Sequence, residues 1–389
     1  MDAAARRPHP AAMPDKGASP DTEADFEAAR LTVRLPAIAA NYRTYQRTAG
    51  PALVAAVVKA DAYGLGALRV GPALAAAGCD SFFVARLAEG VALRSAVPDA
   101  RIFVLDGAQP DAIPALLTHR LTPVLNSLSD IAAWRAAAAA ARTVLDAALH
   151  VDTGMNRLGL PGEELAVLAA EARLRLSGLN LVLVMSHLAC ADDEGADKAM
   201  NARQLDRFRT ALAMLPPAPA SLAASSGTML GMEYHFDMVR PGVALYGANP
   251  QAGQPNLMQM AAMVTARVLQ VRRIDSGDTV GYAATFRARR PSMIATLALG
   301  YADGIPRAAS GRGLAAFGGV RAPIVGRISM DMMTLDVTDM PHPPAPGDEA
   351  ELLGDTITLE EVATAAATNP YEILTRLRRM PRHYTEGAL

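Results

Sequence analysis

The sequence has 389 residues, enough for two domains, because a parallel α/β barrel takes roughly 250 residues and leaves a second unit of ordinary size. The formal net charge is −2 without a basic, aromatic-rich stripe, which argues against a nucleic-acid partner, and no apolar stretch is long enough to span a membrane. Cys79 and Cys190 form no CxxC pair, so the sequence predicts no metal site and favours a reducing, cytoplasmic compartment.

The first residues are rich in Pro, Ala and Asp. Arg6 and Arg7 have no apolar run behind them, so this segment lacks the pattern of a signal peptide. We expect a disordered N-terminal extension over residues 1–27.

One pattern recurs between Leu53 and Ala244: a short apolar run is followed by a longer, alanine-rich segment of helical character. Strands and helices that alternate eight times predict a parallel (β/α)8 TIM barrel, which we assign to residues 28–257, with a doubly wound open sheet as the alternative. The apolar runs are LVAAVVK from Leu53, SFFVA from Ser81, RIFVL from Arg101, LTPVL from Leu121, DAALHV from Asp146, NLVLVMS from Asn180, SLAAS from Ser221 and MVRPGVAL from Met238.

The pattern changes after Leu257. Short runs rich in Val, Thr and Ile, such as MVTARVLQV and SMIATLALGY, are separated by turn segments such as DSGD and PPAPGD. These features predict a second domain of mainly antiparallel strands over residues 258–389, with a helix at ITLEEVATAAA near its end.

The segment AAVVKADAYGLGA carries the clearest chemical signal. Lys59 ends an apolar run and precedes a glycine-containing loop. In a barrel it would lie at the carboxyl end of a strand, where barrel enzymes carry their catalytic groups. A lysine in a partly dry pocket loses its proton readily and can condense with an aldehyde. The alternative is a lysine at a strand end that points to water.

The string VVKADAYGLG resembles the cofactor-lysine motif of the alanine racemase family, whose members are enzymes of fold type III that depend on pyridoxal 5'-phosphate (PLP). The resemblance implies a homodimer with shared active sites that interconverts L- and D-alanine and supplies D-alanine for peptidoglycan. It covers nearly the whole chain after about residue 30, and the other matching segments follow in the expected order: SFFVARLAEG, HVDTGMNRLG, MSHLACAD, FDMVRPGVALYG, VGYAATF, LGYADGIPR, VGRISMD and TNPYE.

The same resemblance implies roles for individual residues. Lys59 would hold PLP as a Schiff base and act as the base on one face of the substrate α-carbon. Arg157 would contact the phenolic oxygen of the cofactor and support the substrate carboxylate, which suits a permanently charged guanidinium with fixed donors. His187 would lie beneath the pyridine ring and touch the catalytic tyrosine. The residues that match the phosphate site are Tyr63, Ser226, Gly242, Val243 and Tyr371.

Arg240 matches the residue that faces the pyridine nitrogen. Arginine does not give up its proton, so the nitrogen would stay unprotonated and the ring would be a weaker electron sink. Return of the proton to the α-carbon then competes well with transamination, whereas a carboxylate at this place would have the opposite effect.

The second domain would contribute the other base. Tyr282, in VGYAATF, matches a tyrosine that acts across the dimer interface on the opposite face of the α-carbon. A free tyrosine has a pKa of about 10, so it needs cationic neighbours to act as a base. Tyr301, Met330 and Asp331 match residues that line the substrate entry and the carboxylate site.

Two positions depart from the common family pattern. Many members carry a carbamylated lysine just before VDTG, which steadies the arginine, where this chain has His150. We therefore expect an anion, a water or a neighbouring side chain beside Arg157. Ser225 stands where asparagine is common, so any contact with the ring oxygen at this position is open.

Three other interpretations keep the PLP barrel. Amino-acid decarboxylases of fold type III share the barrel and the β domain but normally place a carboxylate where this chain has Arg240. A non-catalytic PLP-carrier barrel would lack residues 260–389. A broad-specificity amino-acid racemase would tend to have a secretion signal and disulfides, and the sequence indicates neither. Alanine as the substrate rests on the family resemblance alone.

Overall fold

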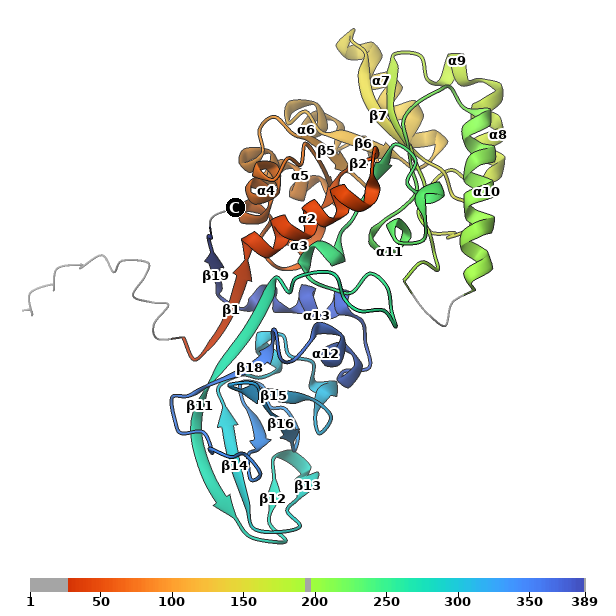
Figure 1. The fold of residues 1–389 in the computed structure, drawn as a ribbon. Coiled ribbons are helices and arrows are strands. Elements are labelled where there is room, and N and C mark those ends of the chain that lie inside the picture. The colour runs from red at the N-terminus through yellow and green to blue at the C-terminus, as the bar shows by residue number, and fades with distance from the viewer. Residues whose placement is uncertain (1–26, 193–196, 388–389) are drawn as a thin grey trace, which may run out of the picture.

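The computed structural model describes residues 27–192 and 197–387. The chain forms a barrel of parallel strands surrounded by helices and, below it in Figure 1, a mainly antiparallel sheet. Of the extension predicted over residues 1–27, all but Glu27 lies outside the described residues. No helix in the described part of the chain is long and apolar enough to cross a membrane.

The apolar runs form the strands of the barrel. β3 to β9 are neighbours in one parallel sheet, and β10 closes the ring by pairing with β2. At this closure the Asp237 N–H donates to the Ala220 carbonyl at 3.0 Å, and the Leu53 N–H donates to the Asp237 carbonyl at 2.9 Å. Each predicted run overlaps a strand, so the predicted barrel is confirmed. The strands are β2 (Leu53–Val54), β3 (Ala56–Val57), β4 (Ser81–Val84), β5 (Arg101–Val104), β6 (Thr122–Leu125), β7 (Leu145–His150), β8 (Leu179–Met185), β9 (Ala220–Ser221) and β10 (Met238–Val239).

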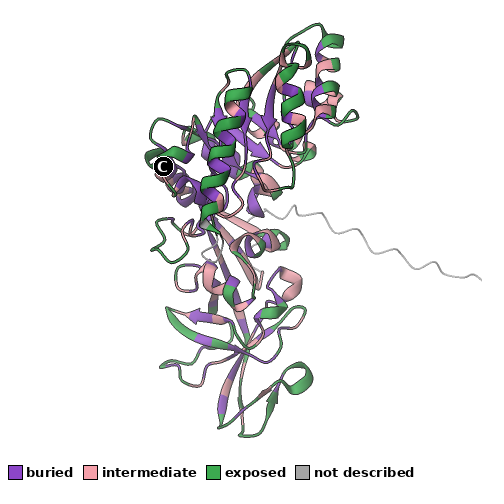
Figure 2. Cartoon of the chain, turned by 90° about the vertical axis from the view of Figure 1, so that its right-hand side faces the viewer, coloured by how far each residue is buried: buried purple, intermediate pink, exposed green. Residues whose placement is uncertain are grey.

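Helices cover the outside of the barrel. α7 begins at an N-cap, where the Ser127 hydroxyl accepts a hydrogen bond from the Asp130 N–H. Buried Trp134 in this helix donates from Nε1 to the Asp146 carbonyl at 3.1 Å and ties the helix to β7. Figure 2 shows the result, with buried strands inside and exposed helix faces outside. The helices are α2 (Leu35–Ala49), α4 (Ala67–Ala76), α5 (Leu87–Ala96), α6 (Ile113–Thr118), α7 (Leu128–Ala141), α8 (Gly162–Ala170), α9 (Ala172–Arg175) and α10 (Lys198–Met214).

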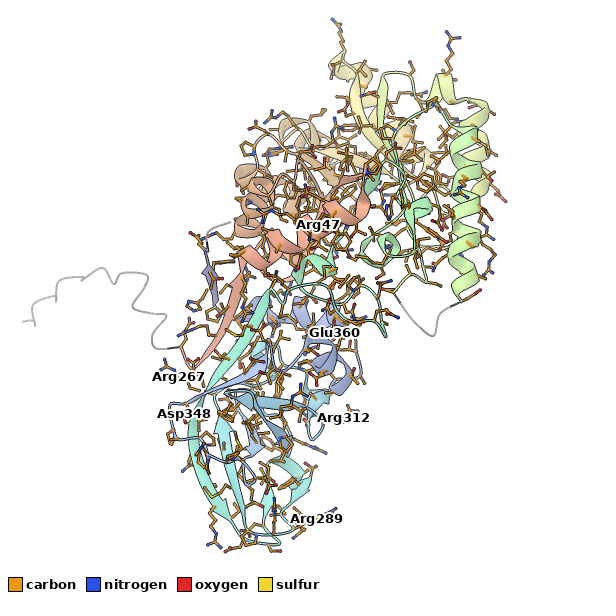
Figure 3. All side chains as sticks on the ribbon, in the orientation of Figure 1. Arg47, Arg267, Arg289, Arg312, Asp348 and Glu360 are labelled. Carbon is orange, nitrogen blue, oxygen red and sulfur yellow. The ribbon has the colours of Figure 1, made fainter. Side chains whose placement is uncertain are left out.

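The long strand β11 (Ala262–Ile274) organises the second unit. It pairs with β1, β14 and β18, and its register with β14 shifts between Val268 and Gln270. The pairs are antiparallel except for β1 and β19, which confirms the predicted β domain. Arg289 lies at the end of this unit away from the barrel (Figure 3). The other elements are β12 (Thr279–Val280), β13 (Phe286–Arg287), β14 (Ser292–Leu297), β15 (Leu314–Phe317), β16 (Val320–Val325), β17 (Met333–Asp336), β18 (Glu349–Leu353), α12 (Leu359–Ala365), α13 (Pro370–Arg376) and β19 (Arg382–Thr385).

β1 (Ala29–Arg34) precedes the barrel in the chain and falls within the range 28–257 assigned to it, but it lies in the second sheet between β11 and β19. Leu31 and Val33 are fully buried there. Their alternation with more exposed residues is typical of a strand, but such local periodicity does not indicate which sheet the strand joins.

Candidate active site

A cavity of about 240 Å³ opens at the carboxyl ends of the barrel strands. Parallel barrels carry their sites at this mouth because the loops that follow the strands converge there. The cavity is lined by eight residues singled out from the sequence, together with His150 and Ser225. The eight are Lys59, Tyr63, Arg157, His187, Arg240, Gly242, Val243 and Tyr371.

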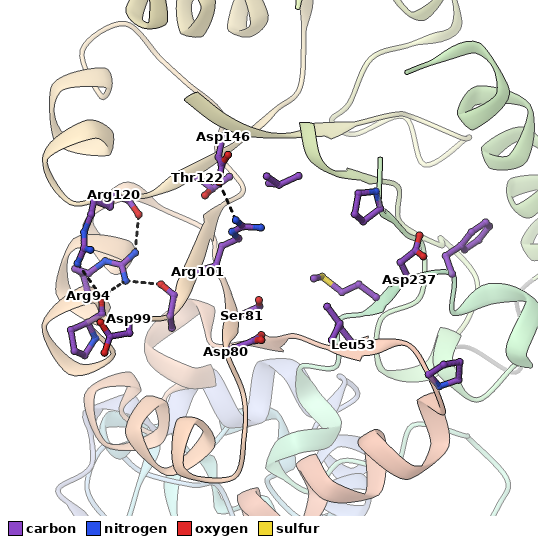
Figure 4. A pocket seen from close by; sticks show the side chains of 17 residues that line it. Leu53, Asp80, Ser81, Arg94, Asp99, Arg101, Arg120, Thr122, Asp146 and Asp237 are labelled. Carbon is purple, nitrogen blue, oxygen red and sulfur yellow. Dashed lines mark hydrogen bonds and ion pairs between the residues drawn. The ribbon is translucent and has the colours of Figure 1, made fainter. Parts of the chain in front are cut away.

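A larger hollow, of about 810 Å³, lies at the opposite mouth of the barrel (Figure 4). Most of its charged groups bind one another or the backbone. Arg101 pairs with Asp146 at 3.0 Å, and Arg94 donates to several carbonyls, among them that of Ala100 at 2.6 Å. Because these side chains already hold the strand ends and helix ends together, the smaller cavity is the better candidate for chemistry.

Lys59 lies two residues after the end of β3, and its side chain lines the cavity. Burial lowers the pKa of Lys59, and the positive charge of Arg157 lowers it further, while Glu89 acts in the opposite direction. A lysine with a lowered pKa is unprotonated more often near neutral pH, which attack on an aldehyde requires.

A left-handed turn follows Lys59 within the short element α3 (Lys59–Tyr63). This conformation costs about 1–2 kcal/mol for each L-residue. Contacts from other elements hold it: the Ala60 N–H donates to Glu89 Oε1 at 2.7 Å, and Asp61 forms an ion pair with Arg382 at 2.8 Å. The sequence suggested only a glycine-containing loop here. The turn consists of Ala60 (φ 54°), Asp61 (φ 57°), Ala62 (φ 52°) and Tyr63 (φ 55°).

Tyr63 and Tyr371 form one wall of the cavity, with ring centroids 6.1 Å apart. Gly242 closes this wall from the barrel side, where a Cβ would lie 2.4 Å from the Tyr63 hydroxyl, so a larger residue would force this tyrosine to move. Burial raises the pKa of both tyrosines, so both remain neutral hydroxyl groups. Hydroxyls and backbone N–H groups around a small space are suited to a phosphate group.

Ser225 and Ser226 begin the short helix α11 (Ser225–Thr228). Ser225 lines the cavity, and its Oγ accepts a hydrogen bond from the Gly242 N–H at 2.9 Å. Ser226 is buried and lines a separate hollow beside Cys190. Successive residues of a helix point about 100° apart, so the two serines face different spaces. The phosphate contact of Ser226 therefore stays a prediction.

Arg240 is the buried cation of the site. It donates to the Ser186 carbonyl at 2.6 Å and to the Ser221 hydroxyl, and lies 3.5 Å from Nδ1 of His187. Burial lowers the pKa of Arg240 to about 9, which leaves the guanidinium charged at neutral pH. Burial, followed by the charge of Arg240, holds the pKa of His187 well below its usual value, so this imidazole is neutral.

His150 ends β7 and lines the same cavity as Arg157. Its Nδ1 lies 2.8 Å from Oδ1 of Asn126. Burial, followed by the charge of Arg240, lowers the pKa of His150 to about 4, so this imidazole is neutral as well. Within the described residues, no group of three His, Cys, Asp or Glu side chains is placed to hold a metal ion, so neither imidazole belongs to one.

Tyr282 lies far from the cavity of its own chain. It begins the turn Tyr282–Ala284 between β12 and β13, at the end of the sheet away from the barrel (Figure 1). Its side chain is 69% exposed. An aromatic side chain presented to solvent at the tip of a hairpin is available for contact with another molecule.

Tyr301, Met330 and Asp331 also lie in the second unit and do not line the cavity. Their loops pack on each other: the Ala302 N–H donates to the Met330 carbonyl at 2.8 Å, and a Cβ on Gly300 would lie 2.3 Å from that carbonyl oxygen. Met330 is 59% exposed. Within one chain these three residues therefore lie together on the second unit and outside the cavity that contains Lys59.

Two residues that shape the site were not singled out from the sequence. Glu89 holds the turn after Lys59 and also accepts a hydrogen bond from the Ala85 N–H at 2.9 Å. Asn126 anchors His150. Both had local signals: Glu89 is an acidic residue in the first turn of a predicted helix, and Asn126 directly follows the apolar run LTPVL.

Comparison with known proteins matches both parts of the chain. Family models described as the N-terminal and C-terminal domains of alanine racemase match residues 33–250 and 261–384. An alanine racemase of Methylobacterium sp. (strain 4-46) is 48% identical over 92% of this chain and 98% of its own length. A crystal structure of alanine racemase from Bartonella henselae, with covalently bound pyridoxal phosphate, is 41% identical with a TM-score of 0.88, covering 92% of this chain and 100% of its own. The biosynthetic alanine racemase of Pseudomonas aeruginosa is 36% identical with a TM-score of 0.86, covering 93% and 100%. The chain belongs to the alanine racemase family.

Proposed function

We propose that the protein is a PLP-dependent racemase that interconverts L- and D-alanine, with Lys59 and Tyr282 as the bases on opposite faces of the α-carbon. The observation that carries this proposal is that Lys59, whose pKa is lowered, and the buried cation Arg240 line the same cavity. Family membership supports the reaction, and the covalently bound PLP of the Bartonella henselae relative supports the cofactor.

The residues present fit PLP. Lys59 would hold it through its amine, and the wall of Tyr63, Tyr371 and Gly242 would receive the phosphate, because Gly242 has no Cβ and so lets the Tyr63 hydroxyl lie close to the backbone of this wall. When bound, PLP would withdraw electrons from the substrate α-carbon and weaken its C–H bond. Arg240 would face the ring nitrogen as a donor that keeps its own proton.

The chain's own groups would then move the proton. Lys59 would exchange it at one face of the α-carbon and Tyr282 at the other. Arg157 would hold the substrate carboxylate by charge-assisted hydrogen bonds. The neutral ring of His187, in contact with Arg240, would orient the catalytic tyrosine rather than compete for the proton. Tyr301, Met330 and Asp331 would line the entry for the substrate.

The site is incomplete within one chain, which supports a homodimer. Tyr282 is exposed at the far end of the second unit, and the cavity that contains Lys59 is lined by residues of the barrel and by Tyr371. In a dimer with two-fold symmetry the same patch meets the same patch, so each cavity would receive Tyr282 of the partner. This arrangement would create two identical shared sites.

The direct test is chiral analysis of products. Purified protein with PLP should convert either enantiomer of alanine into an equal mixture of both, because the two enantiomers have the same free energy in solution. A panel of other amino acids tests for broad specificity, and release of carbon dioxide tests for decarboxylation. Unchanged alanine, or carbon dioxide as the product, would contradict the proposal.

The proposed physiological role is to make D-alanine in the cytoplasm as a building block for peptidoglycan. A bacterial strain without its own alanine racemases, which needs D-alanine in the medium, should grow without this supplement when it expresses the chain. The Lys59→Ala variant is the matched control and should not restore growth.

A further inference from the structure

Arg157 faces the cavity from an exposed loop. Among residues 27–192 and 197–387, no hydrogen bond or ion pair of its guanidinium is found. The inference below rests on the proposed function, which requires this guanidinium to point in one direction, because misplacement of a binding group by even 1 Å lowers the rate. An acceptor close to Arg157 would supply that direction.

The loop that carries Arg157 folds back onto His150. The Leu160 N–H donates to the His150 carbonyl at 2.8 Å, and the Asp152 N–H donates to the Leu160 carbonyl at 3.0 Å. Gly159 lies against the imidazole, where a Cβ would be 3.1 Å from Cγ of His150. Arg157 and His150 therefore belong to one closed loop at the end of β7 and line one cavity.

Asn126 determines which nitrogen of His150 carries the proton. Its Nδ2 donates to the carbonyls of Leu105 and Val124, both at 2.9 Å, and its backbone N–H donates to Oδ2 of Asp130 at 2.9 Å. Carbonyls only accept, so the amide nitrogen must face them and Oδ1 must face His150. An amide oxygen also only accepts, so Nδ1 of His150 is the donor in the 2.8 Å bond.

Nε2 of His150 is then an unprotonated acceptor. The lowered pKa of His150, about 4, agrees with a ring that stays neutral in the working range of pH. Three cations line the cavity: Lys59, Arg157 and Arg240. Lys59 would hold the cofactor, and Arg240 already donates to Ser186 and Ser221. Arg157 offers five N–H donors in a rigid fork and comes from the loop that closes over this imidazole.

We propose that His150, held by Asn126 with its proton on Nδ1, is a positioning residue: when cofactor and substrate occupy the cavity and Arg157 turns toward them, Nε2 of His150 accepts a hydrogen bond from this guanidinium and fixes its direction. The acceptor is part of the chain and uncharged. An anion, a water or a neighbouring side chain was expected beside Arg157, and we assign this place to the side chain of His150. Arg157 then needs neither a bound anion nor carbon dioxide to hold its position.

The tautomer is measured directly on wild-type protein labelled with ¹⁵N-histidine. Protonated and unprotonated ring nitrogens have well-separated ¹⁵N shifts, and the His150 signals are those lost in the His150→Phe variant. We expect a protonated Nδ1 and an unprotonated Nε2 from pH 8 down to about pH 5, since the pKa is about 4. A proton on Nε2 throughout this range would overturn the proposal, whether or not any variant folds.

Kinetics then tests the connection to Arg157. His150→Phe should lower kcat/KM for alanine by about 10- to 100-fold, the range for one hydrogen bond to a charged group. His150→Gln should retain most of the activity, because its amide can donate to Asn126 and accept from Arg157. In an Arg157→Ala background, His150→Phe should have little further effect, because both changes remove the same interaction. His342→Phe, at an exposed position of the second unit, is the matched control.

The outcomes separate this inference from the proposed function. Wild-type racemisation with unchanged kcat/KM in His150→Phe overturns the inference alone. Equal losses from His150→Phe in the wild-type and Arg157→Ala backgrounds also overturn it, because His150 would then act independently of Arg157. A wild-type protein that racemises no amino acid overturns both. Activity of the wild type that rises with added bicarbonate or chloride in depleted buffer contradicts a protein acceptor and also overturns the inference.

Discussion

Replacing Ala60 by glycine should stabilise the protein. Ala60 is exposed with φ at 54°, and its N–H bond to Glu89, at 2.7 Å, does not involve the side chain. Glycine avoids the cost of about 1–2 kcal/mol that an L-residue bears in the left-handed region. It also makes the unfolded chain more flexible, which lowers the free energy of unfolding by about 0.5–1 kcal/mol. The mid-values of these ranges give an expected net gain in the free energy of unfolding of about 0.75 kcal/mol, within limits of about 0 to 1.5 kcal/mol.

Ala136→Gly is the matched control. Ala136 is also exposed, but it lies inside the right-handed helix α7. The same change there should lower the free energy of unfolding by about 1 kcal/mol. The two alanine-to-glycine variants should therefore move stability in opposite directions, which separates backbone strain from any general effect of glycine.

Urea unfolding of the cofactor-free protein at one fixed concentration measures both changes, because bound cofactor and dimerisation would otherwise shift the midpoint. Trp134, the single tryptophan, is buried in the barrel and reports its unfolding by fluorescence. If Ala60→Gly lowers the midpoint as much as Ala136→Gly does, the turn after Lys59 stores no conformational strain and the reasoning is wrong.

Three further outcomes are expected. Borohydride reduction followed by peptide mapping should place the pyridoxyl label on Lys59, and Lys59→Ala should lose the visible absorbance; a label on Lys16 or Lys198, the other lysines, would contradict this. Arg240→Glu should raise the ratio of pyruvate to enantiomer formed from alanine, since a carboxylate favours the protonated ring nitrogen, and an unchanged ratio would count against that role. Inactive Lys59→Ala and Tyr282→Phe proteins, mixed and refolded together, should regain activity in roughly a quarter of their sites by random pairing. No recovery despite confirmed hybrid dimers would mean that Tyr282 does not act across an interface.

The barrel could be predicted because its strands are continuous apolar runs at regular spacing, and periodicity of this kind depends only on neighbouring residues. The place of β1 could not, because Leu31 and Val33 would suit either sheet. The left-handed turn after Lys59 escaped prediction as well. Ala60 and Ala62 have no local reason to adopt positive φ, and the contacts with Glu89 and Arg382 that stabilise it come from distant parts of the chain.

Motifs predicted much of the lining of the cavity, since Lys59, Arg157 and Arg240 each follow a strand and line one mouth of the barrel. What motifs cannot convey is direction. Whether Ser225 or Ser226 faces the cavity depends on the rotation of one short helix turn. The bond between Asn126 and His150 joins the residue after β6 to the end of β7, and only folding brings these two strands side by side.

During synthesis β1 leaves the ribosome long before its partners. It ends at Arg34, while β11 begins at Ala262 and β19 at Arg382. At about 5–20 residues per second, β1 waits on the order of 10 to 50 seconds for β11 alone. The barrel strands emerge within that interval and are able to assemble, while Leu31 and Val33 remain without a sheet. The nascent chain therefore exposes the apolar side chains Leu31 and Val33 at least until β11 emerges, and during that interval they are a binding site for a chaperone that recognises short apolar segments.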